Sequence, residues 1–64
     1  MGFVEFETFT GRIVSICMNH IVCFQECIDV EDCGCKIRVT NGDWIFVKDS
    51  YNKVKDIILC QMGD

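Results

Sequence analysis

Proline is missing from this chain of 64 residues, and so is any long apolar run. Without an apolar stretch of about 20 residues, no segment is expected to cross a bilayer as a helix. Met1-Gly2-Phe3-Val4-Glu5 lacks the charged and apolar regions of a secretory signal, so we expect a cytoplasmic location. Lys and Arg total six against ten Asp and Glu, and the net charge of −4 argues against general binding to a phosphate backbone. We therefore expect neither a membrane nor a nucleic acid as partner.

Groups that would form a catalytic site are also scarce. His20 is the single histidine, and no Cys-x-x-Cys redox motif occurs. The glycines are isolated turn residues rather than a phosphate-binding loop, and the acidic residues show no paired-carboxylate spacing. We predict a protein that is not an enzyme and that needs no cofactor.

Small size and many cysteines are what the chain does have. Sixty-four residues make a single domain, residues 1–64, whose core supplies only about 3–5 kcal/mol of stability. Domains this small often depend on disulfides, a metal ion or a partner subunit. Six cysteines are present, and in a reducing compartment they are expected to remain thiols that pack as small apolar side chains.

Four of these cysteines, Cys23, Cys27, Cys33 and Cys35, are candidate zinc ligands. The spacing of the first two fits a zinc knuckle, whereas the last two are closer together than usual. On an extended strand Cys23 and Cys27 would lie roughly 13 Å apart, too far to share one ion. Substitute ligands would be Cys17 and His20. We expect no metal site, and a zinc-stabilised adaptor and a disulfide from Cys35 to Cys33 or Cys27 under oxidation stay open as alternatives.

Apolar and polar side chains alternate through most of the first 48 residues, as they do on strands with one buried face. With the turn residues between them, they predict five strands over roughly 3–8, 12–17, 21–27, 35–40 and 44–48. Asp49 or Ser50 can cap a helix, and apolar residues then recur every three or four positions, which predicts a helix over roughly 50–62. The expected fold is α+β: one small antiparallel sheet of about five strands followed by one C-terminal amphipathic helix.

Asn41-Gly42 is a strong hairpin signal that allows two strand registers. A two-residue loop pairs Val39 with Trp44, and a three-residue loop pairs Val39 with Ile45 and Ile37 with Val47. We favour the second register because it places the apolar side chains on one face without burying a charge. The opposite face then carries a basic and aromatic set: Lys36, Arg38, Trp44, Phe46 and Lys48.

A Gly turn, apolar strands, a Thr-Asn-Gly turn and an acidic-Ser helix cap follow one another along most of the chain. The pieces are Thr10-Gly11, Ile13-Val14-Ser15-Ile16, Asn19-His20-Ile21-Val22, Ile37-Arg38-Val39-Thr40-Asn41-Gly42, Ile45-Phe46-Val47-Lys48-Asp49-Ser50 and Val54. In this order they resemble the short bacterial flagellar and swarming-motility protein family, whose pattern does not include the six cysteines. The resemblance implies a non-enzymatic module of strands and one helix, of a kind also common in phages and mobile elements.

Large apolar side chains on both faces of the expected sheet predict a partner, because one helix covers only one face. A second copy of the chain is the simplest partner, and another protein is an alternative. We expect a small binding or regulatory module that acts through protein–protein contacts as a homo-oligomer. The predicted partner-binding residues are Lys36, Arg38, Trp44 and Phe46. Besides the zinc adaptor, a phage- or mobile-element-encoded inhibitor or ligand sponge is the alternative role.

Overall fold

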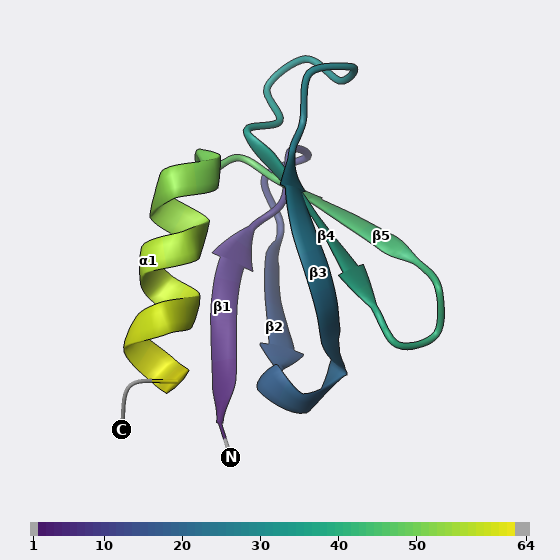
Figure 1. Cartoon of the computed structure of the whole chain (residues 1–64). Coiled ribbons are helices and arrows are strands. Elements are labelled where there is room, and N and C mark those ends of the chain that lie inside the picture. Colours follow the sequence, from purple (N-terminus) through teal and green to yellow (C-terminus); the bar gives the residue numbers. More distant parts are fainter. Residues whose placement is uncertain (1, 63–64) are drawn as a thin grey trace.

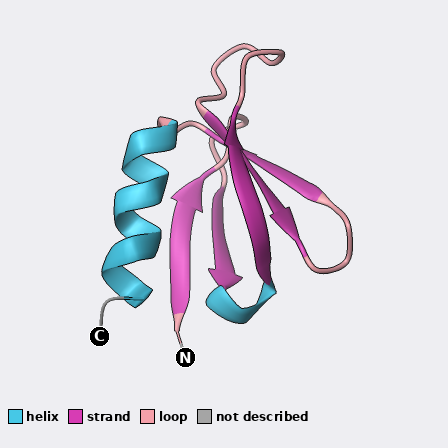
Figure 2. Cartoon of the chain, viewed as in Figure 1, coloured by secondary structure: helices cyan, strands magenta, loops and turns pink. Residues whose placement is uncertain are grey.

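The computed structural model describes residues 2–62 and contains five strands and one α-helix, in the predicted order (Figure 1). The elements are β1 (Phe3–Glu7), β2 (Ile13–Cys17), β3 (Ile21–Glu26), β4 (Cys35–Val39), β5 (Trp44–Val47) and α1 (Tyr51–Met62). A 3₁₀ turn, η1 (Met18–His20), occupies the break that was expected between the second and third strands. Figure 2 shows the strands gathered on one side of the helix. The α+β class is therefore confirmed.

The prediction of one five-stranded sheet was wrong, because the strands divide into two antiparallel sheets. β1 pairs with β2 in the first, and the second has the order β3-β4-β5. The sheets touch at one corner, where Thr8 bridges to Val47 and the Lys48 N–H donates to the Glu7 carbonyl over 2.9 Å. Two facing layers enclose apolar side chains between them, whereas one flat sheet would leave a face uncovered.

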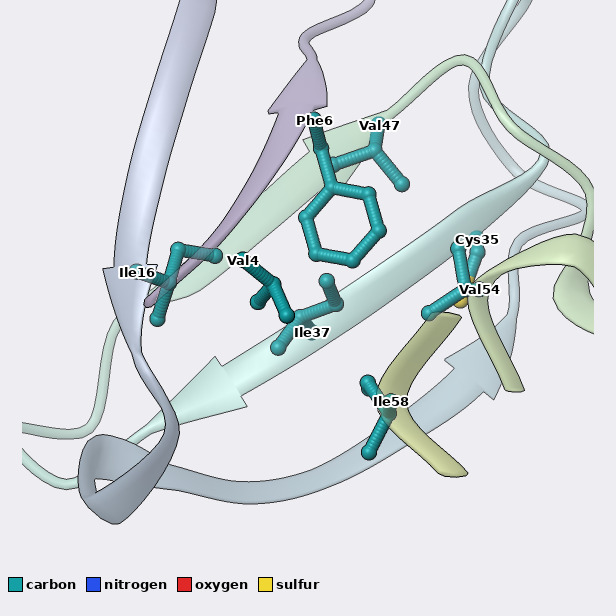
Figure 3. Packing of buried hydrophobic residues seen from close by; sticks show 8 residues of the cluster. All are labelled: Val4, Phe6, Ile16, Cys35, Ile37, Val47, Val54 and Ile58. Carbon is teal, nitrogen blue, oxygen red and sulfur yellow. The ribbon is translucent and has the colours of Figure 1, made fainter. Parts of the chain in front are cut away.

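The core lies where the two sheets and the helix meet (Figure 3). Its eight residues are at most 5% exposed and come from all three layers: Val4, Phe6, Ile16, Cys35, Ile37, Val47, Val54 and Ile58. α1 lies alongside β1 in Figure 1 and also contacts β3, so the helix closes one side of the layered structure. Ser50 fixes its start, since its hydroxyl accepts a 3.3 Å hydrogen bond from the Lys53 N–H.

The β4–β5 hairpin has a register two residues away from the predicted one. Ile37 lies opposite Ile45, and Arg38 lies opposite Trp44. The turn is a three-residue loop over 40–42, closed by the Val39 N–H donating to the Asp43 carbonyl over 3.0 Å. Gly42 holds the last loop position with φ of 94°, a left-handed conformation that favours glycine. A shift of two residues preserves which side chains share a face, so the predicted sorting into an apolar and a basic face is correct.

Candidate interaction surface

The four predicted partner-binding residues lie together on the outer side of the second sheet. They alternate along β4 and β5 with core residues, among them Ile37 and Val47, which are fully buried. Alternate residues of a strand point to opposite sides, so the others face away from the core. We call this surface the Trp44 face and define it by Lys36, Arg38, Trp44 and Phe46.

The indole of Trp44 lies close to two cationic side chains of the neighbouring strand. The Lys36 ammonium is 5.0 Å from the ring centroid, and the Arg38 guanidinium carbon is 5.7 Å from it. Both distances are within the range of cation–π attraction. The cross-strand register produces this arrangement. Arg38 is paired directly with Trp44, and Lys36 is paired with Phe46, the next residue of β5 that faces outward. The indole is therefore half-buried by charged side chains rather than by the core.

Phe9 extends the Trp44 face at its far end and was not among the residues predicted from the sequence. Its ring stands edge-to-face against Phe46, with 5.9 Å between centroids and 86° between the rings. The Phe9 N–H also donates to the Phe46 carbonyl over 3.1 Å. Phe9 follows β1 in a turn, and the isolated bridge between Thr8 and Val47 brings it here. Nothing in the local periodicity indicates that contact.

The charge on the Trp44 face has the opposite sign to that of the whole chain. Lys36 and Arg38 contribute two positive charges, while the chain has a net charge of −4. The Lys36 ammonium lies 3.9 Å from a carboxylate oxygen of Asp29, whose side chain is largely exposed. Such a loose surface ion pair contributes little stability and leaves Lys36 free to meet another carboxylate.

The four candidate zinc ligands lie in different environments. Cys23 is paired with Arg38 across β3 and β4, and Cys35 is fully buried in the core. Cys27 and Cys33 contact each other, and burial together with the Cys27 thiol raises the pKa of Cys33 to about 11. Burial likewise raises the pKa of Cys35 to about 11. Within residues 2–62 no group of three or more Cys, His, Asp or Glu side chains is placed to bind one metal ion.

The structure also contains a groove that was not predicted from the sequence. It has a volume of about 390 Å³ and lies between β2 and the β4–β5 hairpin. His20 lies at its rim, where a ring nitrogen is 3.1 Å from the Thr40 hydroxyl. The floor is formed by side chains of both sheets: Val14, Ile16, Val39 and Ile45. The groove is an incompletely covered part of the apolar space between the sheets.

No helix in the described part of the chain is both long and apolar enough to cross a membrane. Comparisons with protein-family models, with curated proteins and with solved structures gave no match to this chain.

Proposed function

We propose that the chain is a small non-enzymatic binding module that acts through protein–protein contacts as a homo-oligomer in the cytoplasm. The observation that supports this role is the Trp44 indole, held near two cations on an outer sheet face. Trp and Arg are among the residues that most often anchor protein interfaces. A rigid aromatic ring flanked by charged groups offers both apolar area and directional charge to a partner.

The chemistry of the Trp44 face favours an acidic partner surface. If two copies met through this face, Lys36 and Arg38 would approach the same two cations of the other copy, and like charges would repel. An acidic patch on another protein would instead satisfy both cations. We therefore assign the Trp44 face to a different protein and self-association to another surface.

Several large apolar side chains remain exposed and support self-association. Ile13 is 68% exposed and Ile28 is 86% exposed. Others with high exposure are Phe3, Val22 and Leu59. In a domain of this size such side chains are candidates for contacts between copies. Light scattering at micromolar concentration should accordingly give a mass of at least two chains, and a mass of 7.4 kDa would exclude the homo-oligomer.

The partner proposal is tested with the tagged chain expressed in its source cell. Proteins that co-purify with the unmodified chain are compared with those retained by Trp44→Ala, and Lys55→Ala on the exposed side of α1 is the matched control. Each specific protein is then purified and titrated. We expect Trp44→Ala to weaken binding by about 2 kcal/mol, or roughly 30-fold, and Lys55→Ala to leave it unchanged. Equal binding by all three chains would refute the assignment of the Trp44 face.

One feature favours a second role, the inhibitor encoded by a phage or mobile element. Ile28 projects from the loop between β3 and β4 and is followed by three acidic residues, Asp29, Glu31 and Asp32. An apolar tip with surrounding negative charge would suit a basic groove on a target protein. In that case Ile28→Ser, rather than Trp44→Ala, would abolish binding of the co-purified protein.

A further inference from the structure

The outer edge of β2 carries backbone groups that β1 does not use. Both ends of the β1–β2 ladder are hydrogen-bonded pairs: the Thr8 N–H donates to Arg12 O over 2.6 Å, and the Met18 N–H to Gly2 O over 2.9 Å. Antiparallel pairs alternate between bonded and non-bonded, so every second residue of β2 directs its N–H and C=O away from β1. These residues are Ile13, Ser15 and Cys17. Among residues 2–62, β1 is the only strand that pairs with β2.

This β2 edge lacks the features that normally prevent strands from pairing between molecules. Exposed edges are usually protected by a charged residue, a proline or a bulge. Ile13–Cys17 contains no charged residue, and its pairing with β1 is regular. The free edge of β3 differs, because it has an irregularity after Ile21 and ends in Glu26. On a chain with a net charge of −4, an uncharged strand is the segment that a second copy can approach most easily.

The β2 edge is complementary to itself. In an antiparallel pair centred on Ser15, Ile13 of one copy lies opposite Cys17 of the other, and the outward groups form three bonded pairs with about six hydrogen bonds. Val14 then lies beside Ile16 of the second copy. Both point to the core side of their strand, so apolar side chains meet apolar side chains.

The groove beside β2 is where the second strand would place its side chains. Val14 and Ile16 line this groove from one side, and Val39 and Ile45 line it from the other. A second β2 strand paired with the free edge would extend the first sheet over the groove. The Val14 and Ile16 side chains of that second strand would then enter the groove. On the outer side, Ile13 would be covered by the neighbouring strand of the second copy.

We propose that two copies of the chain pair antiparallel along β2, with Ser15 opposite Ser15, to form a continuous four-stranded sheet. This inference rests on the proposed homo-oligomer and identifies the surface that forms it. The uncharged edge, the alternation of Val14 and Ile16 and the adjoining groove all fit a second β2 strand.

The first test compares unmodified chain with Ser15→Pro and Ser15→Ala by sedimentation equilibrium. Proline removes the outward N–H of Ser15, which the β1–β2 ladder does not use, together with the hydroxyl, and edge strands tolerate proline at such positions. Alanine keeps that N–H and removes the hydroxyl that donates to Glu5 over 3.2 Å. We expect Ser15→Pro to weaken dimerisation at least about 30-fold and Ser15→Ala to change it less than about threefold. Circular dichroism verifies that each variant folds.

The second test uses Ser15→Lys and Ser15→Glu, separately and mixed. Like charges directly opposite each other should prevent each variant from dimerising alone, and the mixture should dimerise again. This rescue requires residue 15 of one chain to lie opposite residue 15 of the other. It therefore tests the β2 pairing even if Ser15→Pro fails to fold. A dimer of unmodified chain that persists in both charged variants would overturn the β2 pairing while leaving the homo-oligomer in place. A monomeric unmodified chain would overturn both.

Discussion

Replacing Trp44 by Ala should leave the chain folded, because the indole lies outside the buried cluster of the core. The substitution removes two cation–π contacts, each worth about 0.5–1 kcal/mol at exposed sites. With the partial burial of the ring, we expect the free energy of unfolding to fall by about 1–2.5 kcal/mol. Truncation of fully buried Ile37 should cost about 2–5 kcal/mol, which approaches the whole stability of a domain this small.

The measurement is urea unfolding followed by far-ultraviolet circular dichroism, since Trp44 is the single Trp and its removal abolishes the fluorescence signal. Ile37→Ala is the core control, and we expect it to be largely unfolded without urea. Trp44→Ala should retain a folded spectrum and a cooperative transition at lower urea concentration. A disordered spectrum for Trp44→Ala would show that Trp44 is a core residue, and the proposed partner surface would then be wrong.

Three further changes test other parts of the structure. Gly34→Ala should destabilise the fold by about 1–3 kcal/mol, because a Cβ there would collide with the Asp49 carbonyl. Ser50→Ala should cost about 1 kcal/mol in urea unfolding, since it removes the side-chain cap of α1. The raised pKa values of Cys33 and Cys35, about 11 against 9.0, favour the folded state while both thiols are protonated. Stability should therefore fall between pH 9 and 11, and a chain with both cysteines replaced by Ser should lose less over that interval.

Local sequence signals predicted the elements of this fold well. Alternation and a mostly apolar run over 21–27 predicted five strands. A cap at Asp49 or Ser50, followed by apolar residues at three- and four-residue spacing, predicted α1. The hairpin register escaped prediction for a physical reason. The hydrophobic pattern is unchanged by a shift of two residues, so it cannot separate pairing of Ile37 with Ile45 from pairing with Val47. Gly42 sets the register, because its left-handed backbone conformation suits the last position of the loop.

The way the two sheets meet depends on a contact that no local pattern specifies. Thr8 meets Val47 across a long sequence separation, and this bridge turns the end of β1 onto β5. The same contact brings Phe9 onto Phe46 and so enlarges the predicted surface. The residues of the Trp44 face were predicted because they lie within one hairpin. The groove was not, since it requires β2 to lie over the β4–β5 hairpin.

The two proposed interfaces differ in a way that lets both operate in one assembly. The β2 edge is uncharged and pairs with itself, whereas the Trp44 face is cationic and repels its own copy. They also belong to different sheets, so pairing along β2 does not use the outer side of β4 and β5. A dimer would therefore present two Trp44 faces. When two such sites engage a partner that carries repeated acidic patches, the second contact forms at a high effective concentration. A small surface that binds weakly in one copy can then hold its partner firmly as a pair.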